Sequence, residues 1–312
     1  MKKRQARIRL LIAVGALGAL FWVVPLHSVV EALRQTQPGW LLVGLGLQIL
    51  MRILTAVRMT LLARYQGLAL SFPQMLTILY TASFYSLLLP GALMGGAATY
   101  VKYRQHGGEA GRSLGNVVVN KGLEIFAMLG LATLAGCYLQ GGVKLLMVAM
   151  LVCLLVGWSY RQAALGWGLW PKFRLWVRRS PSKLAKAVGT HVEHLNVFER
   201  VTPLQSRLLL AIAFGCQFVG AGAFIVMGRA VGADVSWVYI IWVYTMVYLL
   251  ALLPVTLANA GVREGIMIWM LQPMGVNAAV ATAWSLCLYM GPLMSAVFGA
   301  LLESHSGSAR KG

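Results

Sequence analysis

The sequence predicts an all-α fold: a polytopic helical membrane protein forming a single domain, residues 1–312, with about six full spans and two broken-helix hairpins. Three observations predict this class, namely the composition, the apolar windows and the uneven distribution of basic residues. Of the 312 residues, 59% are hydrophobic and 11% are charged, and the mean hydropathy is +0.74. One soluble core cannot bury so much apolar surface.

Six windows are long and apolar enough to span a bilayer, which takes about 20 residues at about 1.5 Å each. They are residues 8–27, 40–63, 113–138, 142–160, 206–228 and 276–302. The first follows a basic head, as in a secretion signal, but lacks a small-x-small cleavage site, so we expect an uncleaved span. Two longer regions, about 73–101 and 236–274, are apolar but interrupted by Pro and Gly, and we expect each to form a broken hairpin.

The basic residues indicate the orientation of the spans, because loops rich in Lys and Arg stay in the cytoplasm. One set of loops holds 20 of the 27 basic residues, and the opposite set holds three, Arg34, Lys144 and Arg229. This asymmetry requires 73–101 to start and end on the cytoplasmic side and 236–274 on the outer side. We therefore expect two re-entrant hairpins, both termini in the cytoplasm, and a location in a bacterial inner membrane.

The formal net charge of +19 is best explained by these loops, with attraction to anionic lipid as a consequence, and nucleic acid is not expected as a partner. The loop 161–205 mixes tryptophans with basic residues, as in a segment that lies in the headgroup layer. It is also the candidate surface for recruiting a membrane enzyme. The four cysteines show no metal-ligand spacing, so neither a metal site nor a cofactor is expected.

An internal repeat links the two interrupted regions. YTASFYSLLLPGAL at 80–93 and YTMVYLLALLPVTL at 244–257 agree at six of fourteen positions when aligned at an offset of 164. Because one copy enters from the cytoplasm and the other from outside, the repeat would be inverted in topology. Chance similarity between two leucine-rich stretches is the alternative.

Both copies combine a proline with small residues just beyond it, and we expect the helices to break there. The predicted hinge residues are Pro90, Gly91, Gly95 and Gly96 in the first copy, and Pro254 and Gly261 in the second. Exposed backbone is not tolerated against lipid, so the breaks should face protein or a wet cavity, as in transporters. The alternative is a pair of proline kinks that serve packing alone.

Charged residues within the apolar runs are the candidate binding groups, because a charge at the centre of a span is costly. The basic ones are Arg52, Arg58, Lys121 and Arg263, and the acidic ones are Glu124 and Glu264. Lys121 and Glu124 stand at i, i+3 and can pair on one helix face. Arg263 and Glu264 are adjacent and are not expected to face each other, so their partners should come from elsewhere.

This count leaves about two cations without an acidic partner, close to Asn120 and Asn259. An anion such as a lipid phosphate could supply the missing charge. The alternative to a bound anion is that these basic side chains extend to the membrane surface. This alternative is easier for Arg58, near its helix end, than for Arg52 in mid-helix. The sequence contains no HExxH or phosphate-loop motif, so we expect no catalytic residues and no enzyme activity.

Several segments together resemble a known family. LLPGALMGG, VKYRQHGG, NKGLEIFAMLGL and LLPVTLANAGVREGIMI are similar to the successive signature segments of the lysylphosphatidylglycerol synthase transmembrane-region family, also described as flippase-like. The resemblance covers about residues 10–302. It implies about eight helical segments related to the domain that moves an aminoacylated phospholipid across the bilayer, here as a stand-alone member without the soluble synthetase domain.

The match to the family is partial. Members often have an acid after the Gly-Gly and an Arg soon afterwards, whereas this chain continues with Ala97, Ala98 and Thr99 and offers Lys102 instead. A Glu-Arg pair followed by Asp is common in the next helix, where this chain has Asn120, Lys121 and Glu124. The segment Gly261 to Gly265 is kept.

The leading hypothesis from the sequence is a lipid translocase that carries an anionic or aminoacylated phospholipid, or a lipid-linked headgroup, through a cationic cavity. Arg52, Lys121 and Arg263 would receive the phosphate, assisted by Asn120 and Asn259. Glu124 and Glu264 would hold the cations or meet an amino group. The competing hypothesis is a non-transporting membrane component that binds a lipid or glycolipid and recruits an enzyme through 161–205.

Overall fold

The computed structural model describes residues 26–88, 94–106, 108–140, 201–250 and 261–308. Within these ranges the chain forms nine α-helices and one short 3-10 helix, and no strand. Four of the helices are long and apolar enough to cross a membrane: α3 (Pro38–Tyr65), α6 (Ala110–Gln140), α10 (Pro203–Ala230) and α13 (Ala278–Ser308). The prediction of an all-α polytopic membrane protein is confirmed.

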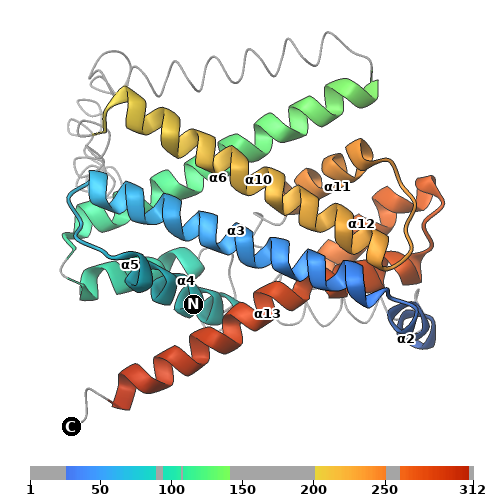
Figure 1. The fold of residues 1–312 in the computed structure, drawn as a ribbon, viewed down its shortest axis with the longest axis horizontal. Helices are drawn as coiled ribbons and strands as arrows, with labels where there is room; N and C mark the ends of the chain where they lie inside the picture. The colour runs from blue at the N-terminus through green and yellow to red at the C-terminus, as the bar shows by residue number, and fades with distance from the viewer. Residues whose placement is uncertain (1–25, 89–93, 107, 141–200, 251–260, 309–312) are drawn as a thin grey trace, which may run out of the picture. The chain divides into compact units, whose positions relative to one another are not determined.

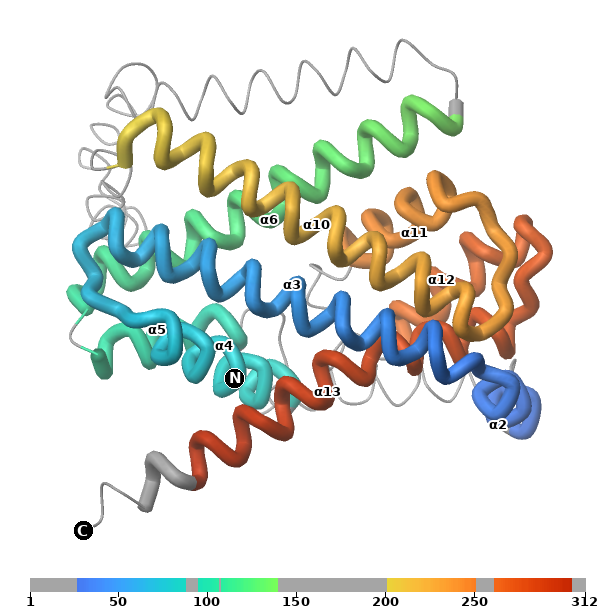
Figure 2. Tube along the Cα trace, viewed as in Figure 1, coloured from blue at the N-terminus to red at the C-terminus, as the bar shows by residue number. Residues whose placement is uncertain are grey.

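The helices follow the same order twice along the chain (Figures 1 and 2). In the first half, α3 is followed by two shorter helices, α4 (Phe72–Leu88) and α5 (Met94–Gln105), and then by α6. In the second half, α10 is followed by α11 (Trp237–Leu250), α12 (Val262–Leu271) and α13. α3 and α10 are each 28 residues long, and α6 and α13 are each 31. The predicted internal repeat is therefore visible in the lengths and order of the helices.

The turns that end α3 and α10 are also equivalent. Gly67 and Gly232 both have a φ of 78°, a conformation that glycine adopts without strain. Leu68 N donates to Ala63 O at 2.8 Å, and Ala233 N donates to Gly228 O at 2.9 Å, which is the same bond 165 residues later. Such a left-handed glycine with a bond back into the last helical turn is a common way to end a helix.

The sequence also specifies where α4 and α10 begin. Ser71 N donates to the Gln74 side chain at 2.8 Å while Gln74 N donates to Ser71 Oγ at 3.5 Å. Thr202 and Gln205 exchange the same two bonds at 2.9 and 3.3 Å. These reciprocal bonds are capping boxes of the form S/T-x-x-Q, which satisfy backbone donors that the first turn leaves free.

The chain divides into two compact units, and each is described here by itself. Unit 1 comprises Met1–Ile53, Leu76–Ala98 and Cys216–Gly312, and unit 2 comprises Leu54–Met75 and Thr99–Gly215. In unit 1, α13 packs against α12 and against α2 (Leu26–Arg34), where Val29 meets Ala278 and Ala279 (Figure 1). α2 was not predicted, because its nine residues are too short to form a span.

Each interrupted region contains two helices that pack against each other. α11 and α12 are in contact, and the 3-10 helix η2 (Gln272–Met274) ends the second region. In the first region, a side chain at Gly95 of α5 would collide with Ser86 of α4, so the two helices lie against each other at this point. The helical pairs at 73–101 and 236–274 are thus present, while the side of the membrane from which each enters remains a prediction.

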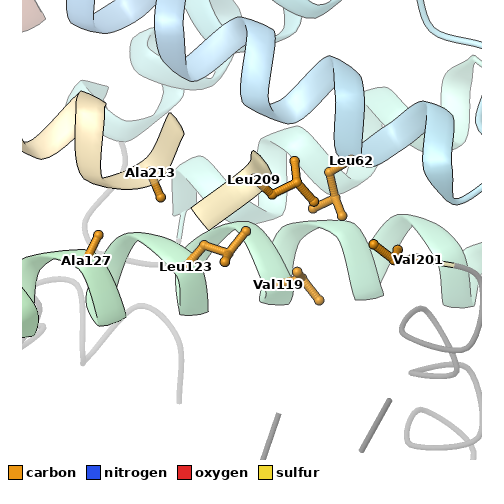
Figure 3. Packing of buried hydrophobic residues seen from close by; sticks show 7 residues of the cluster. All are labelled: Leu62, Val119, Leu123, Ala127, Val201, Leu209 and Ala213. Carbon is orange, nitrogen blue, oxygen red and sulfur yellow. The ribbon is translucent and has the colours of Figure 1, made fainter. Parts of the chain in front are cut away.

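Unit 2 has an apolar core between three helices (Figure 3). Leu62 of α3 packs with Val119 and Leu123 of α6 and with Leu209 of α10. Small residues allow the helices to approach closely: Ala127 and Ala213 are both fully buried there, and Gly130 lies against Phe214. Membrane helices associate through such close packing, because lipid provides no hydrophobic driving force between them.

Candidate functional site

Arg263 at the start of α12 is held by several polar contacts within unit 1. Its Nε donates to Ser285 Oγ at 2.7 Å, and its Nη2 donates to Ser285 O at 3.1 Å and to Glu264 Oε1 at 2.8 Å. Ser285 Oγ in turn donates to Glu264 Oε1 at 2.7 Å. The guanidinium carbon also lies 4.8 Å from the centre of the Tyr289 ring, one turn further along α13. These four residues are the Arg263 cluster.

Local backbone chemistry positions this cluster. Gly261 precedes α12 with a φ of 82°, and its N donates to Glu264 Oε2 at 2.7 Å. Glu264 therefore satisfies a free donor of the first helical turn with one oxygen and binds Arg263 and Ser285 with the other. The carboxylate is almost fully buried, whereas 16% of the Arg263 side chain is exposed.

The expectation that Arg263 and Glu264 would not face each other is wrong, since the two side chains form an ion pair. In the first turn of a helix Glu264 bends back to the cap, and the long Arg263 side chain can follow it to the same serine of α13. The expectation of further partners from another element is confirmed by Ser285. Arg263 Nη1 donates to no group in the described part of the chain, so the charge is paired while one nitrogen stays available for a ligand.

Lys121 and Glu124 form the ion pair that their spacing predicts. In α6, Lys121 Nζ lies 3.2 Å from Glu124 Oε2. The two side chains are 45% and 34% exposed, and Lys121 shares its side of α6 with the exposed Val118 and Gly122. The pair therefore lies on a surface of α6 that the described residues leave uncovered.

Asn120 is directed away from that surface into a buried polar cluster of unit 2. Its Nδ2 donates to Asn116 Oδ1 at 2.9 Å, and Tyr103 OH donates to the same oxygen at 3.0 Å. Asn116 Nδ2 donates to Gln66 Oε1 at 3.2 Å. The structure therefore separates Asn120 from its neighbour Lys121, although the sequence analysis grouped the two as one binding site.

Arg58 is the residue whose environment the sequence analysis misjudged. Snorkelling was expected near the helix end, but Arg58 is only 2% exposed, and neither Nε nor Nη1 has a hydrogen-bond partner within the described ranges. α3 extends seven residues beyond it to Tyr65, so the helix end is not close enough for the side chain to reach water. The sequence does contain a clue to this burial. Leu62 is four residues beyond Arg58, and residues four apart lie on the same face of a helix, so Arg58 shares the packed face of Leu62.

The remaining candidate residues are distributed as follows. Arg52 is partly exposed in the middle of α3, and Gly95 and Gly96 lie in the first turn of α5 and not in the interruption before it. Gly261 ends the second interruption, in keeping with a hinge. Four predicted site residues fall outside the described residues: Pro90, Gly91, Pro254 and Asn259, as does most of the loop 161–205.

Comparison with known proteins places the chain in a membrane-protein family. The chain is similar to the UPF0104 membrane protein of Methanothermobacter thermautotrophicus, with 23% identity over 305 residues that cover 90% of this chain and 89% of the relative. The sequence profile described as Lysylphosphatidylglycerol synthase TM region matches residues 7–290, which include both interrupted regions and the Arg263 cluster. This multi-pass membrane protein therefore belongs to the lysylphosphatidylglycerol synthase transmembrane-region family.

Proposed function

We propose that this protein is a flippase-like lipid translocase of the inner membrane, which moves a phospholipid or a lipid-linked headgroup between leaflets while the acyl tails stay in the bilayer. Its substrate would carry an anionic or aminoacylated headgroup. No covalent chemistry is needed for this function. Both termini would face the cytoplasm, in agreement with the basic loops of the sequence.

The observation that carries the proposal is the Arg263 cluster. A charged residue inside the membrane normally marks a substrate pathway when it is held by other polar groups. Glu264 and Ser285 accept three hydrogen bonds from the guanidinium and fix it, so little side-chain entropy is lost when an anion binds. The partly exposed Arg263 side chain and the positive end of α12 then favour a phosphate at this position.

Glu264 and Glu124 would have different roles. Both oxygens of Glu264 already accept bonds, so its role is to hold Arg263. Glu124 is one-third exposed next to Lys121 and is the better candidate for meeting an amino group of a substrate. The positive charges of Lys121 and Arg52 would attract the phosphate of the substrate as it crosses the membrane.

The two interruptions would supply the movement. α4 and α5 flank one, α11 and α12 flank the other, and each carries a proline in the stretch between its helices. Broken helices that meet at a binding site are a recurrent feature of transporters with internal repeats. Rocking of these hairpins about Pro90, Gly91, Pro254 and Gly261 would give alternating access.

A leaflet-accessibility assay tests the function directly. The purified protein is reconstituted into vesicles that contain fluorescent phosphatidylglycerol, and a membrane-impermeant quencher reports the rate at which lipid reaches the outer leaflet. Arg263→Gln should slow this rate at least tenfold, because about 1.4 kcal/mol of lost interaction changes an equilibrium tenfold. The matched control is Arg112→Gln, which breaks an exposed ion pair with Glu109 (3.1 Å) and should leave the rate unchanged.

Two results would contradict the proposal. The first is a wild-type rate in Arg263→Gln vesicles, provided that the variant elutes as a single species. The second is a wild-type protein that moves no lipid but loses its cellular function when the basic residues of 161–205 are neutralised. That second result would favour the non-transporting component that recruits an enzyme.

A further inference from the structure

Unit 2 contains a buried cation that the proposed function does not use. Arg58 is 2% exposed, and its Nε and Nη1 make no hydrogen bond in the described part of unit 2. No carboxylate of the described residues lies within ion-pair distance of it. The C-terminal part of α3 around it is largely buried, with Ala56, Met59, Leu62 and Ala63 all below 7% exposed.

An uncompensated guanidinium in this position is energetically unfavourable. Arginine stays protonated in proteins, so Arg58 cannot lose its charge as a buried lysine could. Transfer of an ion out of water costs several kcal/mol even after the protein relaxes, and each buried donor without a partner adds about 1–3 kcal/mol. A bound anion would offset these costs.

The neighbours of Arg58 can be placed along one helix face. Leu62, one turn further on, packs with Val119 and Leu123 of α6 (Figure 3), and Gln66, two turns further on, bonds to Asn116 of α6. Residues four apart lie on the same face and about 6 Å apart along the axis. Arg58 therefore lies on the face of α3 that packs against α6.

The same interface holds other polar atoms without a partner. Among the described residues they are Gln66 Nε2, Asn120 Oδ1 and Ser113 Oγ. Gln66 and Arg58 offer only N–H donors here, and Ser113 can donate as well. Of these residues, Arg58 alone carries a charge, and its two free N–H donors suit an anion with several oxygens. Gln66 lies eight residues further along the chain, about 12 Å at 1.5 Å per residue, so the proposal rests on Arg58 itself.

We propose that Arg58 is the anchor of a buried binding site for a phosphate-class oxyanion within unit 2. Charge-assisted bonds from a guanidinium to phosphate oxygens are short and strong, and they would satisfy both free nitrogens of Arg58. The source of the phosphate is either a lipid headgroup or free phosphate. The site does not depend on lipid transport, since unit 2 contains none of the residues of the Arg263 cluster.

Thermal unfolding of the full-length protein in a phosphate-free maltoside detergent tests the site. The probes are short-chain phosphatidylglycerol, inorganic phosphate, sodium chloride at matched ionic strength, and a diacylglycerol that lacks phosphate. With a phosphate-bearing probe at about a hundred times its Kd, the unfolding temperature of the wild type should rise on the order of 5 °C. Chloride and diacylglycerol should give no comparable rise.

In an Arg263→Gln background, which removes the phosphate contact proposed above, Arg58→Met should abolish this rise. Its matched control is Arg64→Met, which removes the same charge from an exposed position on α3 and should keep the full rise. Without phosphate, Arg58→Met should be at least as stable as the wild type, because it removes a buried charge that has no partner. A rise only with phosphatidylglycerol identifies a headgroup site, and an equal rise with inorganic phosphate identifies a free-phosphate site.

Three outcomes would overturn the proposal. The first is a wild type that responds to neither phosphate-bearing probe. The second is an Arg58→Met variant that keeps the full response in the Arg263→Gln background. The third is an Arg58→Met variant that is destabilised equally with and without phosphate, which would indicate a purely structural role. Should Arg58→Met fail to fold, Arg58→Lys decides. Lysine keeps the positive charge but cannot bind a phosphate in two places as arginine does, so Arg58→Lys should show the same rise in unfolding temperature at about tenfold higher probe concentration. The same rise at an unchanged probe concentration would count against the site.

Discussion

The two halves of the chain share their helix pattern but place their charges on different helices. In the second half, the short helix α12 carries Arg263 and Glu264 in its first turn. At the matching place in the first half, α5 begins with Met94, Gly95 and Gly96, and the charges lie instead on the long helices as Arg58, Lys121 and Glu124. A repeat therefore preserves the framework of helices while the binding groups on it diverge.

The contrast is clearest between the two ion pairs. Glu264 is buried, Arg263 is largely buried and both bind Ser285, whereas Lys121 and Glu124 are a third or more exposed. Breaking a buried pair leaves a charge without compensation, while an exposed pair contributes little to stability. We therefore expect the pair on α12 to determine local stability and the pair on α6 to affect function alone.

The largest expected effect is that of Glu264→Gln. It leaves Arg263 without a counter-charge and should destabilise the protein by about 3–5 kcal/mol. Thermal unfolding in detergent measures this effect. The double variant Arg263→Met/Glu264→Gln should recover much of the lost stability, because it also removes the positive charge of Arg263 that Glu264→Gln leaves without a counter-charge. If the double variant is no more stable than Glu264→Gln alone, the buried charge is not the cause.

An intermediate effect is expected for Gly261→Ala, which puts a side chain at a φ of 82°. An L-residue in this conformation costs about 1–2 kcal/mol and should displace the cap of α12. The control is Gly265→Ala, an exposed position in the same helix with nothing within 4 Å of the added carbon, which should be neutral or gain about 0.5–1 kcal/mol. Equal unfolding temperatures for the two variants would refute a special role of Gly261.

The smallest effect on stability is expected for Lys121→Ala. Loss of an exposed i, i+3 pair should cost at most about 0.5 kcal/mol, hardly visible in thermal unfolding. Lipid movement in the leaflet-accessibility assay should nevertheless be abolished if Lys121 receives the phosphate. Destabilisation as large as that of Glu264→Gln would mean that the pair on α6 is buried after all, and the contrast between the halves would disappear.

Local features of the sequence predicted much of this protein. The apolar windows located α3, α6, α10 and α13 to within a few residues, and the i, i+3 spacing predicted the Lys121–Glu124 pair. The repeated Tyr-Thr and Leu-Leu-Pro pattern indicated the duplicated order of helices. These predictions succeed because span length and helix spacing depend on residues close together in the chain.

Predictions that required knowledge of packing were less successful. Snorkelling of Arg58 was inferred from its distance to a helix end, but α3 runs on to Tyr65 and packs against α6 on that face. The contact between Arg263 and Glu264 depends on Ser285, which lies 22 residues beyond Arg263 on another helix. Helix periodicity alone describes neither the cap geometry nor the serine.

The sequence by itself determined that this chain is a helical membrane protein, because hydropathy is a property of the chain alone. Tertiary structure decided which charges are compensated. Arg263 is neutralised because α12 and α13 bring a carboxylate and a hydroxyl to it. Arg58 is buried where α3 packs against α6, and none of the residues that the structure describes binds its Nε or Nη1. Compensation of charge in a membrane depends on neighbours from other helices, and only packing determines which residues those are.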